Sequence, residues 1–249
     1  MTIDTRSLAA FRIAIGLTIL LDLLHRAGSL RRFYTDEGAY PIAVHVAIQG
    51  DAGRLSLHAL SGAAWFQAAL FALAGLFALA FIVGHRTRLV GLVSLVLLVS
   101  LHVRAPVVLN GGDRLLRVLL FVALFSPLGE RWSIDARRRE SARRTVASVG
   151  TAALLAQPLA VFTANAIKKS RGELWYGGDA VAVALQDTTT ATGFGVELLE
   201  SPALLSALTH GWVLLLAGAI PLLLALVGRR RALAVTAYLT AFAGMALSL

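Results

Sequence analysis

The chain contains only two lysines, the adjacent residues Lys168 and Lys169. A buried lysine can lose its proton, whereas an arginine in a protein cannot. Burial disfavours the charged amine, and the neighbouring cation Arg171 acts in the same direction. Lys169 is therefore a candidate general base. The alternative is that both lysines extend their ammonium groups to water at a membrane surface.

Two residue types near Lys169 could complete a site. Asn165 precedes Lys169 by four residues, so on a helix the two side chains share a face. Trp175 and Tyr176 follow the lysines. Aromatic residues are common at membrane boundaries, and this is the alternative explanation for the pair.

A second polar group lies at 110–117, with the sequence NGGDRLLR. Asn110 to Asp113 can form a tight turn, and Asp113 can cap the following helix. Asp113 and Arg117 are four residues apart, which permits an ion pair. Alternatively, Asn110 and Arg117 face inward as the floor of a polar pocket.

Two further polar positions fall within the first apolar stretch. Arg12 needs a partner or a role, because a charged residue inside a membrane span costs at least about 2.5–3.5 kcal/mol on insertion scales. Asp22 and His25 are three residues apart and can share a helix face. They form either a local polar pair or part of a cavity lining.

Several other chemistries are excluded by what the sequence lacks. Without cysteine there are no disulfides, zinc–thiolate sites or thiol nucleophiles. No two of the six histidines are three or four residues apart, and no Glu-x-x-His occurs. We therefore expect no di-iron or histidine-rich metal site. There is also no Gly-x-Ser-x-Gly and no phosphate-binding loop.

The elements that must position these residues are membrane helices. Of the 249 residues, 57% are hydrophobic and 15% charged, against about 25% charged in soluble domains. A span needs about 20 apolar residues. We therefore predict an all-α, polytopic integral membrane helix bundle of about seven spans, forming one domain over 1–249. The expected spans are 8–24, 63–83, 89–103, 115–128, 146–167, 210–227 and 232–249.

The distribution of charge predicts the orientation. Segments 1–7, 84–88, 129–145 and 228–231 are short and arginine-rich, and they carry most of the net charge of +9. Basic loops stay in the cytoplasm, so we place the N-terminus inside the plasma membrane. The surplus of positive charge is then explained by the membrane orientation and requires no nucleic-acid partner. The two long segments, 25–62 and 168–208, lie outside and are where a site is expected. The last apolar stretch reaches Leu249 without a polar flank, which suggests a truncated chain.

Several motifs together resemble one family. The chain is similar to the vitamin K-dependent gamma-glutamyl carboxylases and their prokaryotic relatives, the HTTM domain proteins, and the similarity extends over nearly all of the sequence. The motifs that carry the resemblance are SLAAFRIAIG at 7–16 through Asp22, FYTDEG at 33–38 with Pro41, GHRTR at 84–88, NGGDRLLR at 110–117, RWSID at 131–135 and KKSRGELW at 168–175.

The resemblance implies a function. The carboxylases use a lysine to deprotonate reduced vitamin K, which oxygen then converts to a strong base that activates a peptidyl glutamate. The matching lysine is Lys169. A reduced quinone, menaquinol or vitamin K hydroquinone, would be the cofactor. The expected binding residues are Asn110, Asp113, Arg117, Asn165 and Trp175, and the expected partners are the lipid bilayer, the quinone and a secreted peptide.

Three departures from the family limit what carries over. Gly111 stands where the carboxylases place a histidine after Asn110, and Phe242 stands where a histidine is usual before Gly244 and Met245. The chain also lacks the large outside domain that binds carboxylase substrates. The resemblance therefore supports quinol oxidation by this chain more strongly than it supports glutamate carboxylation. The alternatives are a non-catalytic membrane partner in the maturation or export of a secreted peptide, and an inactive truncated remnant.

Overall fold

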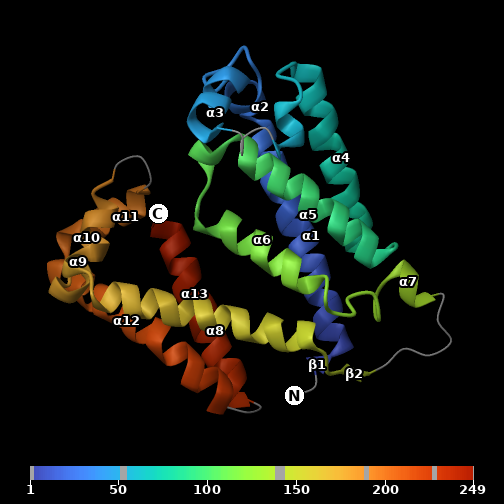
Figure 1. Cartoon of the computed structure of the whole chain (residues 1–249). Coiled ribbons are helices and arrows are strands. Elements are labelled where there is room, and N and C mark those ends of the chain that lie inside the picture. The colour runs from blue at the N-terminus through green and yellow to red at the C-terminus, as the bar shows by residue number, and fades with distance from the viewer. Residues whose placement is uncertain (1–2, 51–54, 138–143, 188–190, 226–228, 249) are drawn as a thin grey trace. The chain divides into compact units, whose positions relative to one another are not determined.

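The computed structural model describes residues 3–50, 55–137, 144–187, 191–225 and 229–248. Apart from two short strands, the regular elements of this part of the chain are helical, which confirms the all-α prediction (Figure 1). The α-helices and strands are β1 (Ile3–Asp4), α1 (Thr5–Ala27), α2 (Leu30–Tyr34), α3 (Ile42–Gln49), α4 (Ala64–Val83), α5 (Thr87–Arg104), α6 (Gly111–Ala123), α7 (Ile134–Arg137), β2 (Thr145–Val146), α8 (Val149–Ser170), α9 (Glu173–Gly177), α10 (Ala180–Leu185), α11 (Gly193–Glu197), α12 (Pro202–Ala225) and α13 (Arg229–Ser248).

Four described helices, α1, α4, α5 and α8, are long and apolar enough to cross a membrane. A fifth candidate is a pair of helices, 193–200 and the first part of α12, with a bend of 112° at the break between them. Helix α6 has 13 residues, and at 1.5 Å per residue it is about 20 Å long, shorter than a hydrocarbon core of about 30 Å. The integral membrane architecture is supported, and the count of seven spans stays a prediction. Residues 226–227 and 249 of the two last predicted spans lie outside the described residues.

The chain forms two compact units, residues 1–154 and 155–249, and each is described by itself. In the first unit α1 packs along α4, and α4 along α5. The buried core includes Ile15, Ile19, Phe81 and Leu97. Gly16 allows the close approach of α1 and α4, because a Cβ there would lie 2.5 Å from Ile82 Cγ1.

Arg12 holds one end of the first unit together. Its side chain is completely buried, and its two terminal nitrogens donate to four backbone carbonyls. Nη1 donates to Leu128 at 2.8 Å and to Arg131 at 3.2 Å, and Nη2 donates to Ile82 at 3.2 Å and to Trp132 at 2.5 Å. Arg12 therefore binds the end of α4 to the segment that follows α6. Its hydrogen-bond partners are backbone carbonyls of α4 and of the loop, and not an acidic side chain.

Segments that were predicted to share one membrane face meet at this end of the unit. Ile3 pairs with Val146 in the antiparallel β1–β2 ribbon. The Asp135 amide donates to the Gly84 carbonyl at 3.1 Å. The segments 1–7, 84–88 and 129–145 are thus neighbours, as expected if they lie on one side of the membrane. Residues 138–143, which include three of the expected basic side chains, lie outside the described residues.

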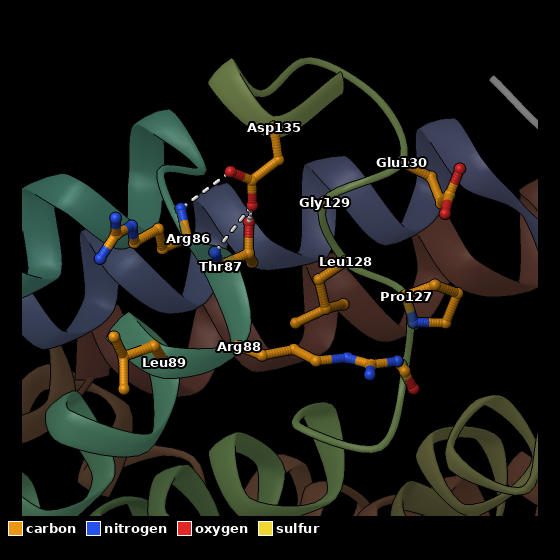
Figure 2. Close-up of a pocket in the computed structure, with 10 residues that line it drawn as sticks. Arg86, Thr87, Arg88, Leu89, Pro127, Leu128, Gly129, Glu130 and Asp135 are labelled. Carbon is orange, nitrogen blue, oxygen red and sulfur yellow. Dashed lines mark hydrogen bonds between the residues drawn. The ribbon is translucent and has the colours of Figure 1, made fainter. Parts of the chain in front are cut away.

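Asp135 caps the start of α5 (Figure 2). Its carboxylate accepts hydrogen bonds from the Arg86 amide at 2.8 Å, the Thr87 amide at 2.8 Å and the Thr87 hydroxyl at 2.7 Å. Partial burial raises the pKa of Asp135, but the hydrogen bonds from Thr87 and Arg86 outweigh it and hold that pKa below its usual value. The neighbouring cavity of about 460 Å³ is bordered by the same three residues.

Replacing Asp135 by alanine should therefore destabilise the protein by about 0.5–2 kcal/mol at neutral pH, the usual range for a lost helix cap. Because the pKa of Asp135 is lower in the folded state, its stabilisation is present above the unfolded pKa of about 3.9 and is lost as the pH falls through the folded value. In detergent, the difference in thermal unfolding midpoint between the wild type and the Asp135→Ala variant should become smaller as the pH is lowered from 7 to 3. The exposed Glu37→Ala variant is the control, and a difference that does not change with pH would contradict this account.

Candidate functional site

The second unit contains an apolar cavity of about 620 Å³. Its walls come from α9 to α13 and from the last turn of α8, and most of the lining is hydrocarbon. Leu208, Trp212 and Leu215 of α12 line it, together with Met245 of α13. Among the described residues of the lining, Lys169 is the one lysine or arginine. An apolar cavity with a single cationic group suits an amphipathic ligand.

The two lysines have different surroundings. Lys168 is exposed, whereas Lys169 is half-buried and lines the cavity. The Lys169 Nζ lies 3.3 Å from the centroid of the Trp175 ring, a cation–π contact. No acidic side chain in the described parts of the chain forms an ion pair with Lys169. The structure thus brings together two predicted site residues, Lys169 and Trp175, and separates Lys169 from Lys168.

The turn between α8 and α9 produces this contact. The Gly172 amide donates to the Lys169 carbonyl at 3.1 Å, and the Trp175 amide donates to the Gly172 carbonyl at 3.0 Å. A Cβ on Gly172 would lie 3.3 Å from Trp175 Cδ1, which is a tight contact. The small residue at 172 therefore allows the indole to fold back over the lysine.

Asn165 lies apart from this cavity. Its side chain is exposed, and its Nδ2 donates to the Val161 carbonyl at 2.8 Å, one turn earlier in α8. It is not among the residues that line the cavity. The spacing of four residues that relates Asn165 to Lys169 does not by itself place both side chains on the cavity.

The predicted group at 110–117 belongs to the first unit. Asn110 caps α6 by accepting from the amides of Gly112 and Asp113, and the Asp113 Oδ2 accepts from the Asn110 amide at 2.8 Å. The capping box confirms that this segment caps the helix, but the N-cap residue is Asn110, whereas Asp113, the predicted cap, lies in the first turn of α6 and accepts from the Asn110 amide. The Asp113 Oδ1 accepts from Arg26 Nη2 at 2.7 Å. Arg117 is half-buried, and the acid four residues before it pairs with Arg26 instead.

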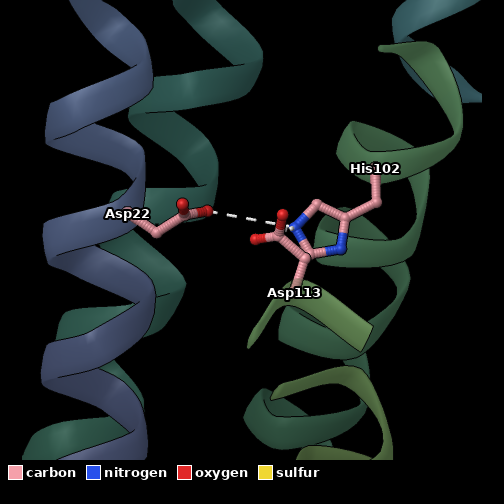
Figure 3. A group of neighbouring side chains, drawn as sticks. All are labelled: Asp22, His102 and Asp113. Atoms are coloured by element: carbon pink, nitrogen blue, oxygen red, sulfur yellow. Dashed lines mark ion pairs between the residues drawn. The ribbon is translucent and has the colours of Figure 1, made fainter. Parts of the chain in front are cut away.

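Arg26 is a residue that the sequence patterns did not single out. Its Nε donates to both carboxylate oxygens of Asp22, at 2.9 and 2.8 Å, and it also binds Asp113. Asp22 therefore pairs with Arg26, and His25 is exposed. His102 of α5, completely buried, faces the two carboxylates (Figure 3). The one sequence signal for this cluster is the four-residue spacing of Asp22 and Arg26, which permits an ion pair on one helix face.

Two other buried polar groups surround the same end of the first unit. Arg104 is fully buried, and its Nη2 donates to the carbonyls of Tyr34 at 3.3 Å and Tyr40 at 2.9 Å. His58 Nδ1 lies 2.7 Å from Gln67 Oε1. Burial lowers the pKa of His58 to about 4, so this imidazole is neutral at neutral pH. These contacts hold the 25–62 segment against α4 and α5.

The aromatic residue at position 242 packs against the wall of the cavity in the second unit. The Phe242 ring lies 5.0 Å from the Trp212 ring between centroids, in an edge-to-face arrangement. Gly244 and Met245, which follow it, line the cavity. The segment where the family usually has a histidine thus supports the wall with an aromatic ring.

Comparison with known proteins identifies the family. The model of the HTTM domain matches residues 1–248. No curated protein matches the chain, and neither does any solved structure. The HTTM match covers both units, the helices that could span a membrane and the cavity around Lys169. The chain therefore belongs to the HTTM domain family, the family of vitamin K-dependent carboxylase-type membrane proteins.

Proposed function

We propose that the protein is a quinol-oxidising membrane enzyme in which Lys169 is the general base. The observation that carries this proposal is the position of Lys169. Of two adjacent lysines, one is exposed and the other lines an apolar cavity without an acidic partner among the described residues. The family supports the choice of a quinol, because its carboxylase members act on reduced vitamin K.

The cavity fits a reduced quinone in size and in chemistry. A volume of about 620 Å³ lies within the range of about 300–1,000 Å³ that is usual for small-molecule sites. The leucines, Trp212 and Met245 would hold the ring and its apolar tail, and Lys169 would face the hydroxyl. When bound, the quinol supplies an acidic hydroxyl and two electrons for the reduction of oxygen.

Lys169 would receive the proton of that hydroxyl at its Nζ. The product is an ammonium, which the face of the Trp175 ring stabilises through the contact at 3.3 Å. The ammonium in turn stabilises the adjacent anionic oxygen. The apolar lining keeps bulk water away from this charge pair and strengthens the attraction. We place the site at the extracytoplasmic face of the plasma membrane, with the N-terminus inside.

Quinol oxidation at Lys169 does not require that a peptide be modified or that the polar group at 110–117 take part. Asn110, Asp113 and Arg117 lie in the first unit, where Asn110 and Asp113 serve the cap of α6. Their predicted contact with substrate is not needed for the chemistry at Lys169. Glutamate carboxylation is not part of the proposal. A non-catalytic partner in peptide maturation or export is the alternative if no quinol is consumed.

The direct test uses the full chain purified in detergent. Bound lipids are extracted and analysed by mass spectrometry for quinones, and oxygen consumption is measured with menaquinol and with vitamin K hydroquinone. We expect a co-purifying quinone and consumption of oxygen that depends on the quinol. A well-folded protein with no bound quinone and no turnover above the uncatalysed rate would overturn the proposal.

A further inference from the structure

We propose that Asp22, His102 and Asp113 form a binding site for a divalent transition-metal ion. The three residues come from α1, α5 and α6 and meet inside the first unit (Figure 3). One ligand atom from each lies within 4.8 Å of the other two. All three residues belong to the first unit, whereas the cavity at Lys169 belongs to the second.

The distances in the cluster suit an intervening ion better than a direct contact. His102 Nε2 lies 3.7 Å from Asp113 Oδ1 and 3.9 Å from Asp22 Oδ2. Both separations are too long for a hydrogen bond. Metal–nitrogen and metal–oxygen bonds of about 2.0–2.2 Å in a tetrahedral site separate neighbouring ligand atoms by about 3.4 Å. The carboxylate oxygens of Asp22 and Asp113 lie within 4.8 Å of each other, so a movement of up to about 1.4 Å between the two carboxylates would complete such a site.

The imidazole of His102 is the second observation that indicates a ligand. The side chain is completely buried, and neither ring nitrogen has a hydrogen-bond partner among the described residues. Buried polar atoms are seldom left unpaired, because an unpaired one costs about 1–3 kcal/mol. Figure 3 shows the ring turned toward the two carboxylates. A metal bound at Nε2 would satisfy the atom that faces them.

The charges of the side chains in and around the cluster also favour binding of a cation. Asp22 and Asp113 together carry two negative charges, and Arg26 supplies one positive charge through hydrogen bonds to both. The three charged side chains Asp22, Asp113 and Arg26 therefore carry a net charge of −1 in a largely buried place. Isolated buried charge is costly, so the cluster favours an additional cation.

Arg26 can remain in place while the metal is bound. A carboxylate oxygen accepts more than one interaction, and ligating carboxylates are usually hydrogen-bonded to other groups that fix their orientation. The Asn110 amide does the same at the other oxygen of Asp113, at 2.8 Å. One imidazole and two carboxylates are ligands that Zn²⁺ and related divalent transition metals accept. Three protein ligands would leave a position open for water.

The test measures metal content and metal binding of the full chain in detergent, purified through a tag without histidines. Elemental analysis should find close to one transition-metal ion per chain. After chelation, added Co²⁺ should give a visible absorption spectrum that Zn²⁺ abolishes. His102→Ala and Asp113→Asn should each weaken Co²⁺ binding at least tenfold. His25→Ala, which changes an exposed histidine on the same helix as Asp22, should bind like the wild type.

The wild-type protein alone can overturn the proposal, even if a variant fails to fold. No metal after purification, together with no Co²⁺ spectrum in a folded wild-type chain, would overturn the proposal. Equal Co²⁺ binding by wild type and a folded His102→Ala variant would also contradict it. Chelation should lower the thermal unfolding midpoint of the wild type and leave that of folded His102→Ala unchanged.

Discussion

Replacing Lys169 by arginine should reduce quinol-dependent oxygen consumption by at least about 10²-fold, since general base catalysis contributes about 10²–10⁴-fold. Arginine preserves the positive charge and much of the length of the side chain, but it cannot give up its proton in a protein. A loss of activity in this variant therefore reports on proton transfer and not on charge alone. The measurement is the initial rate of oxygen uptake at saturating quinol.

Lys168→Arg is the matched control for this prediction. Lys168 is exposed and does not line the cavity, so the substitution should leave the rate within about twofold of wild type and the stability nearly unchanged. Both variants should bind quinone, because the apolar lining of the cavity is unchanged. Equal rates for the two arginine variants would remove Lys169 from the role of base.

Replacing Arg12 by methionine should cause the largest loss of stability of any single substitution considered, about 3 kcal/mol or more. The change removes the donors for the carbonyls of Ile82, Leu128, Arg131 and Trp132. The hydrogen bond to Leu128 is buried and the other three are partly buried. A buried acceptor left unpaired costs about 1–3 kcal/mol, and methionine offers no donor. Denaturant unfolding in detergent, followed by circular dichroism, measures the change.

Arg6→Met is the control for Arg12, because Arg6 is an exposed arginine on the same helix. This variant should unfold within about 0.5 kcal/mol of the wild type. If Arg12→Met unfolds at the same denaturant concentration as Arg6→Met, the four hydrogen bonds do not stabilise the fold as described. The folded fraction of Arg12→Met should also fall during expression, since single membrane domains have little stability to spare.

Local patterns in the sequence predicted the features that depend on residues close together in the chain. Apolar stretches of the right length gave the positions of α1, α4, α5 and α8 to within a few residues. The sequence from Asn110 to Asp113 predicted that a cap starts α6, because capping involves residues only three apart, although the N-cap is Asn110 and not Asp113 as predicted. The contrast between lysine and arginine singled out the pair Lys168 and Lys169, and the family resemblance selected Lys169 as the candidate base.

Contacts between helices could not be predicted in this way. Arg26 and Asp113 are 87 residues apart, and His102 meets Asp22 only because α1 and α5 pack with a particular rotation. The partners of Arg12 are backbone carbonyls, which no side-chain pattern marks. Local spacing can also mislead: Asn165 is four residues before Lys169 on the same helix, yet only Lys169 lines the cavity. Rotation and register of packed helices are set by the whole core.

The most direct measurement of the central claim, that the cavity at Lys169 binds the quinol, is photo-crosslinking with an azido-quinone analogue followed by peptide mapping. We predict labels on residues that line the cavity, such as Leu208, Trp212 and Met245. Excess menaquinone should compete with the label. Labels confined to residues 3–154, or unaffected by excess menaquinone, would contradict the account.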